Sequence, residues 1–196
     1  MDAFLLSFGV IFLAELGDKS QLMALAFATR FPAIPVLVAI TLATLVVHLG
    51  SVALGATVAL ALPTDVISIV AGVAFLVFAV WTLRGDRLDE TDEARARRET
   101  TGSVIVTVGT AFFLAELGDK TMLATVTLAT NHGALGTWLG STAGMVAADA
   151  IAIGVGKALG TRLPERAIRI GAAVAFVVFG VILIWQGVQG GGDLPA

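Results

Sequence analysis

Residues 12–19 read Phe-Leu-Ala-Glu-Leu-Gly-Asp-Lys, and residues 113–120 repeat the same eight letters. Each copy is followed by a hydroxyl side chain, Ser20 in the first and Thr121 in the second. At the same offset of 101 residues, 25 of the 69 positions from 12 to 80 are identical to their counterparts. Eight consecutive identities that include three charged residues indicate a duplicated chain rather than a coincidence of hydropathy.

The composition around these motifs predicts an integral membrane protein. Of the 196 residues, 57% are hydrophobic and 14% are charged, and the mean hydropathy is +0.94. Eleven of the 27 charged residues lie between Arg84 and Glu99, so the remainder of the chain is nearly apolar. These values exclude a soluble enzyme, a nucleic-acid-binding protein and a disordered chain. The chain also has no Cys, which excludes a disulfide scaffold, an iron–sulfur site and a thiolate metal site.

The fold class we predict is an all-α membrane protein. Six apolar stretches are long enough to cross a bilayer, and apolar and polar residues do not alternate along them as they would in strands. The predicted spans are residues 4–28, 36–61, 66–83, 103–129, 135–159 and 167–188. Regularly spaced glycines (Gly136, Gly140, Gly144) and paired aromatics (Phe75, Phe78, Phe176, Phe179) are interpreted as helix packing or lipid contact.

The spans divide into two halves that we expect to be inverted. The predicted division is a first three-helix repeat at 1–83, a charged linker at 84–102, a second repeat at 103–190 and a tail at 191–196. Three spans are an odd number, so the second copy enters the membrane from the opposite side. Two inverted three-helix repeats are typical of secondary transporters, whose binding site lies where the repeats meet.

The loop charges predict an orientation. Nine arginines follow spans 1, 3 and 5: Arg30, Arg84, Arg87, Arg95, Arg97, Arg98, Arg162, Arg166 and Arg169. The other loops and both termini carry no Lys or Arg. By the positive-inside rule the 84–102 linker is cytoplasmic and both termini are outside.

The duplicated motif places four carboxylates near the middle of the membrane. Glu15 and Glu116 lie about 17–20 Å along their spans at 1.5 Å per residue, and the core is ~30 Å thick. Asp18 and Asp119 follow at i+3, on the same helix face. Glycines between them leave backbone accessible and could loosen the helix. Carboxylates at this depth are costly unless they are paired, hydrated or bound to an ion.

An oxygen-only cluster suits hard cations, namely Ca²⁺, Mg²⁺ or Mn²⁺. The candidate metal ligands are Glu15, Asp18, Ser20, Gln21, Glu116, Asp119 and Thr121. Because burial disfavours the charged carboxylate, protons and a divalent cation would compete for the same oxygens. That competition predicts cation–proton exchange.

Four further polar side chains have open roles. Lys19 and Lys120 are counter-ions of the site, or they snorkel away from it, or they pair with the glutamate at i−4 and merely stabilise the helices. His48 and Asp149 occupy equivalent positions near the middle of their spans. They are candidates for a proton or cation relay.

The duplicated Glu-Leu-Gly-Asp-Lys-Ser/Thr resembles the Glu-x-Gly-Asp-Lys/Arg-Ser/Thr signature of the Gdt family of manganese and calcium transporters. The resemblance covers the whole chain. It implies that Glu15, Asp18, Glu116 and Asp119 bind the cation, with Ser20 and Thr121 contributing hydroxyls, and that Mn²⁺ or Ca²⁺ is exchanged for protons. The short chain without an N-terminal extension looks like the bacterial, manganese-exporting form, in the cytoplasmic membrane.

Three alternatives remain beside a Mn²⁺ exporter. The first is an exporter of another small solute, although four carboxylates disfavour an anionic one. The second is an intramembrane aspartyl protease using Asp18 and Asp119, which has no evident need for the adjacent glutamates and lysines. The third is a purely structural membrane protein. We expect membrane lipid as a partner, and neither a prosthetic group nor nucleic acid.

Overall fold

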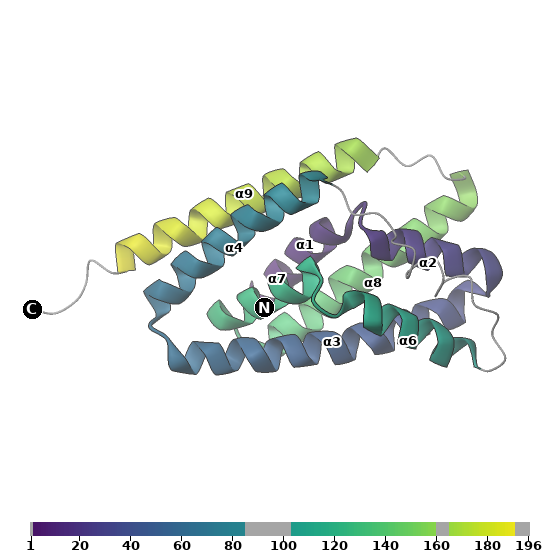
Figure 1. The fold of residues 1–196 in the computed structure, drawn as a ribbon, viewed down its shortest axis with the longest axis horizontal. Coiled ribbons are helices and arrows are strands. Elements are labelled where there is room, and N and C mark those ends of the chain that lie inside the picture. Colours follow the sequence, from purple (N-terminus) through teal and green to yellow (C-terminus); the bar gives the residue numbers. More distant parts are fainter. Residues whose placement is uncertain (1, 85–102, 160–164, 191–196) are drawn as a thin grey trace, which may run out of the picture.

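The computed structural model describes residues 2–84, 103–159 and 165–190, and all their regular structure is helical (Figure 1). The helices are α1 (Asp2–Glu15), α2 (Lys19–Arg30), α3 (Ala33–Ala61), α4 (Thr64–Arg84), α6 (Val104–Glu116), α7 (Lys120–Asn131), α8 (Ala134–Leu159) and α9 (Glu165–Gly190). The all-α prediction is therefore confirmed. Except for Arg84, the predicted linker 84–102 lies outside the described residues, as does the tail 191–196.

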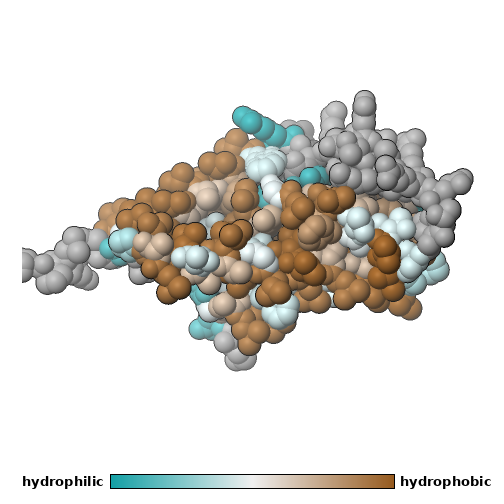
Figure 2. Space-filling view, turned by 60° about the horizontal axis from the view of Figure 1, so that its bottom comes forward, coloured by the Kyte–Doolittle hydropathy of each residue, from teal (hydrophilic) through white to brown (hydrophobic). Residues whose placement is uncertain are grey.

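Four helices are long and apolar enough to cross a membrane. Their membrane-compatible segments are Ala33–Ala61, Asp65–Arg84, Ala134–Val155 and Ile170–Gln189. They coincide with four of the predicted spans. The face shown in Figure 2 is covered mainly by hydrophobic side chains, as expected for a surface that contacts lipid. The chain is a multi-pass membrane protein.

The other two predicted spans are not continuous helices, which corrects the expectation for 4–28 and 103–129. The first is divided into α1 and α2, and the second into α6 and α7. Gly17 and Gly118 have φ angles of 76° and 80°, a left-handed conformation that costs a side-chain-bearing residue about 1–2 kcal/mol. The glycine of each motif thus turns the chain instead of merely leaving the helix backbone accessible.

Glycines on α8 allow it to pack directly on the backbone of α1. A Cβ added at Gly140 would lie 2.3 Å from the carbonyl oxygen of Phe4, and one at Gly144 would lie 2.5 Å from that of Phe8. The packing interpretation of these glycines is confirmed. Both contacts have the same register, so α1 and α8 run in parallel, and Glu15 comes close to the level of Asp149.

An aromatic cluster joins α4 to α9, which lie side by side in Figure 1. The rings of Phe75 and Phe176 are 5.7 Å apart between centroids. Phe75 also contacts Phe179 at 6.2 Å, and Phe78 contacts Phe176 at 6.1 Å. These separations are typical of favourable aromatic pairs. The aromatic residues singled out in the sequence therefore pack against one another.

Candidate functional site

Two equivalent turns carry the acidic residues of the duplicated motif. Glu15 is the last residue of α1, and Glu116 is the last residue of α6. Asp18 and Asp119 are the N-cap residues of the helices that follow. In each turn the aspartate backbone N–H donates to the glutamate carbonyl, with N···O distances of 3.1 and 3.2 Å. The same local sequence thus forms the same local structure twice.

All four acidic side chains are buried. The exposed fractions of Glu15 and Asp18 are 0%, and those of Glu116 and Asp119 are 1% and 4%. A carboxylate removed from water is strongly destabilised unless hydrogen bonds or positive charges replace its hydration. Several buried acidic oxygens have no hydrogen-bond partner: Glu15 Oε1 and Oε2, Glu116 Oε1, Asp119 Oδ2, and Asp149 Oδ1 and Oδ2.

The position of the glutamates in their helices makes this burial more unfavourable. The C-terminus of a helix carries partial negative charge, and the residues usually found there are basic. Neither α1 nor α6 has a basic residue in its last turn, and each ends on a glutamate instead. A cation placed beside these helix ends would therefore be stabilised by the carboxylate and by the backbone carbonyls together.

The two motif lysines form ion pairs that join the two turns. Lys19 Nζ lies 3.2 Å from Asp119 Oδ1, and Lys120 Nζ donates to Asp18 Oδ1. The second pair is the counterpart of the first at the offset of 101 residues. Of the roles left open by the sequence, the structure therefore favours counter-ions, and each lysine acts on the motif of the other half.

The neutral candidates differ in how their polar groups are used. Ser20 Oγ donates to Asp18 Oδ2 at 3.3 Å, and Thr121 Oγ1 donates to Glu116 Oε2 at 2.9 Å. Both hydroxyls are thus directed at acidic oxygens of the turns. Gln21 instead accepts from the Gly17 N–H at 2.8 Å and donates to the Ala148 carbonyl at 2.9 Å. Its amide therefore fixes the first turn against α8.

Of the two relay candidates, Asp149 belongs with the motif carboxylates. It is fully buried on α8, and it is an electrostatic neighbour of Glu15, Glu116 and Asp18. His48 is buried on α3, with its Nδ1 3.5 Å from Thr142 Oγ1, and its Nε2 has no hydrogen-bond partner. The sequence alone could not place either residue relative to the turns.

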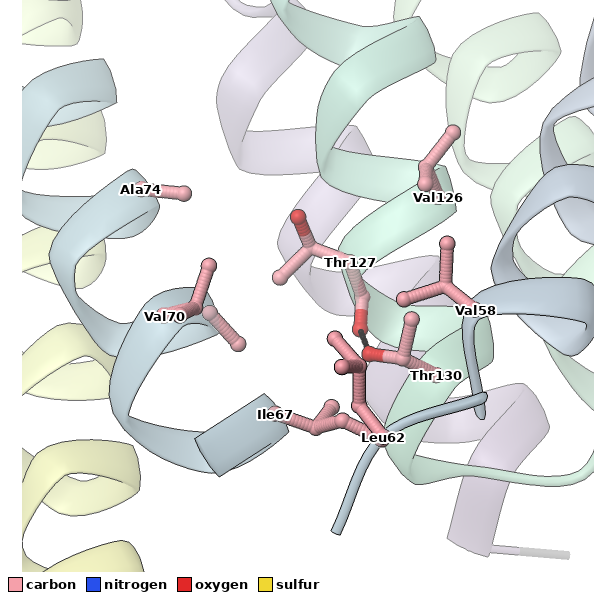
Figure 3. A pocket seen from close by; sticks show the side chains of 9 residues that line it. Val58, Leu62, Ile67, Val70, Ala74, Val126, Thr127 and Thr130 are labelled. Atoms are coloured by element: carbon pink, nitrogen blue, oxygen red, sulfur yellow. Dashed lines mark hydrogen bonds between the residues drawn. The ribbon is translucent and has the colours of Figure 1, made fainter. Parts of the chain in front are cut away.

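The carboxylates do not form a compact metal cage. Among the side chains that the structure describes, no group of three or more His, Cys, Asp or Glu residues is arranged to hold a metal ion. A separate cavity of about 130 Å³ is lined by residues of α3, α4 and α7, whose side chains are drawn in Figure 3. Its lining is apolar apart from Thr127 and Thr130, whose hydroxyls donate to backbone carbonyls. This cavity offers no ligands for a cation.

Some polar features of the structure were not anticipated from the sequence. The Gly118 N–H is directed at Met122 Sδ at 3.1 Å, the counterpart of the Gly17–Gln21 hydrogen bond. Ser7 Oγ and Thr137 Oγ1 are buried without hydrogen-bond partners. A single hydroxyl in an apolar span is too weak a signal to have identified Ser7 or Thr137.

Comparison with known proteins extends these observations. The model of the family described as "Divalent cation/proton antiporter GDT1" matches residues 3–90 and again residues 104–191. A Vibrio cholerae protein named "Putative manganese exporter" is 37% identical over 172 residues, which cover 86% of this chain and 84% of the relative. The Synechocystis GDT1-like protein sll0615 is 27% identical, over 94% of this chain and 98% of its own length. No solved structure matches the chain significantly.

A third relative comes from a plant. The Arabidopsis thaliana protein PAM71, named as chloroplastic, is 33% identical over 91% of this chain and 55% of its own length. The apolar helices and these matches together define a multi-pass membrane transporter rather than an enzyme, so the protease alternative is withdrawn. The chain belongs to the GDT1 family of divalent cation/proton antiporters.

Proposed function

We propose that the protein exports Mn²⁺ from the cytoplasm in exchange for protons, with Ca²⁺ as the alternative cargo. The observation that carries the proposal is the set of buried acidic oxygens at the two turns and on α8. Six of them have no hydrogen-bond partner, four at the turns and two on Asp149. Hard divalent cations prefer such oxygen ligands. Manganese is placed first because the name of the Vibrio cholerae relative describes a manganese exporter.

The proposed cargo ligands are the acidic residues Glu15, Asp18, Glu116 and Asp119, with the hydroxyls of Ser20 and Thr121. Gln21 supports the first turn instead of binding the cargo, because its amide is already used. Asp149 and His48 are the proposed relay residues, and Asp149 is favoured because it is a buried electrostatic neighbour of Glu15.

The proposed scaffold is six membrane spans in two inverted repeats, with the turns at the midplane. The helix bounds support it, because α7 (Lys120–Asn131) is α2 (Lys19–Arg30) displaced by 101 residues. The packing supports it as well: α1 contacts α8, and their counterparts α6 and α3 contact each other. The family model also matches the two halves separately. Discontinuous spans with ion-binding breaks recur in secondary transporters.

Exchange follows from what the buried oxygens can bind. A carboxyl group away from water is stabilised either by taking up a proton or by binding a cation. The two ligands therefore exclude each other at the same oxygens. We place the protein in the cytoplasmic membrane with both termini outside, as the loop arginines predict.

The decisive experiment measures Mn²⁺ and Ca²⁺ flux in proteoliposomes with and without an imposed pH gradient. Glu15→Gln and Glu116→Gln keep the side-chain size but remove the charge, and each should lower flux by more than about tenfold. Asp2→Asn, at an exposed position, is the matched control and should keep wild-type flux. Flux that does not depend on the pH gradient would contradict cation–proton exchange. Undiminished flux in both Gln variants would contradict the proposed binding site.

A further inference from the structure

We propose that Lys19 and Lys120 are tethered cations that compete with the cargo for the aspartates. Each ammonium group binds, in the opposite half, a carboxylate that the proposed cargo needs. A divalent cation then binds by displacing them, so the lysines set its affinity without being ligands. This inference rests on the proposed function. It assigns a role to the lysine of each motif copy, which cargo binding alone does not explain.

The geometry of the pairs carries the argument. A lysine immediately follows the aspartate of its own turn, yet the ion pairs are Lys19 with Asp119 and Lys120 with Asp18. Both aspartates are buried, so little water is available to replace the ammonium group. A cation that approaches either aspartate must therefore exchange with a lysine that is already present. Tethering gives each lysine a high effective concentration at its partner.

The count of charges indicates what kind of cargo can make this exchange. Two lysines supply two positive charges to the five buried carboxylates of the turns and α8. One divalent cation brings the same charge as two ammonium groups, so displacement leaves the charge of the buried cluster unchanged. A monovalent cation in place of both ammonium groups would leave one more carboxylate uncompensated at low dielectric, which is costly. The pairs thus favour divalent over monovalent cargo.

The same displacement accounts for the arrangement of the ligands. No three acidic or histidine side chains among the described residues are arranged to hold a metal ion, while Asp18 and Asp119 are each bound to a lysine. Release from the lysines is the movement that frees these carboxylates to join Glu15 and Glu116 around a cargo ion.

The two lysines differ in burial, which predicts an order of release. The side chain of Lys19 is 21% exposed, whereas that of Lys120 is 3% exposed. Lys19 can leave Asp119 toward the surface, but Lys120 has to move through packed protein. We therefore infer that the Lys19–Asp119 pair opens first.

The test is Mn²⁺ binding by the purified full-length protein at neutral pH, by calorimetry and by the paramagnetic resonance of free Mn²⁺. Lys19→Gln removes the competing charge and should lower the Kd by about tenfold or more. Lys19→Arg keeps the charge and should stay near wild type. A ligand or a purely structural lysine predicts the opposite sign, since its removal would weaken binding. An unchanged or higher Kd for Lys19→Gln overturns the proposal.

Lys120→Gln should tighten binding as well, although its deep burial makes misfolding a risk. A measurement on the wild type covers that case. The sequence contains three lysines, Lys19, Lys120 and Lys157, so ¹⁵N-lysine labelling gives three side-chain signals to follow by NMR during Ca²⁺ titration. Displacement predicts shifts of the first two signals and not of the third. Unshifted Lys19 and Lys120 signals at saturating Ca²⁺ overturn the proposal.

These experiments separate the two proposals. If the folded wild type binds neither Mn²⁺ nor Ca²⁺, the proposed function fails. If the wild type binds cation and Lys19→Gln binds it no more tightly, the function stands and the lysine proposal alone fails.

Discussion

The two copies of the motif are identical over eight residues, but their surroundings are not. In the first half, the Gly17 N–H donates to the Gln21 amide, and Lys19 reaches the surface. In the second, the Gly118 N–H is directed at the Met122 sulfur, and Lys120 is buried. The identical motif residues therefore determine the conformation of the turn, while the neighbouring residues determine how polar and how accessible each turn is.

The contrast extends to the helices that pack on the turns. Asp149, near the first turn on α8, has His48 on α3 as its counterpart. Gly140 of α8, which packs on the backbone of α1, likewise has a different residue as its counterpart: Ala39 of α3. A molecule of two equal halves could bind a cargo ion symmetrically. These differences make the two halves unequal.

Removing the lysines should expose the largest difference between the halves. Lys120→Ala removes the buried ion-pair partner of Asp18 and should lower the free energy of unfolding by about 3–5 kcal/mol. Lys19→Ala should cost about 1–2 kcal/mol, because the partly exposed pair is already weakened by solvent. Denaturant unfolding in detergent without divalent cations measures both. Equal losses would mean that the two pairs are equally buried.

Substitutions at the α1–α8 contact and at its counterpart on α3 should also have unequal effects on stability, with a smaller difference than that between the two lysine variants. Gly140→Ala places a methyl group against the backbone of α1, and we expect a loss of about 1–3 kcal/mol. The reciprocal change, Ala39→Gly, removes a methyl group and adds helix flexibility, for about 1 kcal/mol. Thermal unfolding of the two variants tests this, and a neutral Gly140→Ala would contradict the close approach of α1 and α8.

Much of this organisation could be predicted from the sequence, for physical reasons. Long apolar stretches identify membrane helices, because a helix satisfies its backbone hydrogen bonds within the one segment that crosses the lipid. Charge at mid-span identified Glu15, Asp18, Glu116 and Asp119 as candidate site residues. Glycines spaced by four identified the packing face of α8. Each of these signals lies in a short segment and needs no knowledge of what packs against it.

The features that escaped prediction depend on conformation or on contacts between distant segments. Gly17 suggested a loosened helix, but only its φ angle shows a turn that ends one helix and starts another. The lysine pairs join residues 100 and 102 positions apart, so the i+4 spacing within each helix pointed to the wrong partners. The proximity of Asp149 to Glu15 likewise depends on the parallel packing of α1 and α8.

The turn itself can be tested at a position where space is not a factor. A Cβ added at Gly118 would meet nothing within 4 Å, so Gly118→Ala changes only the backbone preference. At φ 80° this should cost about 1–2 kcal/mol of unfolding free energy. Gly50→Ala, which also meets nothing but lies inside helix α3, is the matched control and should be neutral or slightly stabilising. Similar effects at both sites would argue against a strained turn.

The smallest effect should come from making the two turns alike. Gln21→Met removes the acceptor of the Gly17 N–H and the donor to the Ala148 carbonyl, and should cost about 1–2 kcal/mol. Met122→Gln gives the second turn the amide of the first, and should change stability by less than about 0.5 kcal/mol because its turn is already exposed at Gly118. Amide hydrogen exchange at Gly17 and Gly118 provides the local measurement. Faster exchange at Gly17 alone in Gln21→Met would locate the loss of stability in the first turn. Faster exchange at both glycines would show that the two turns, which are joined by ion pairs, respond as one unit.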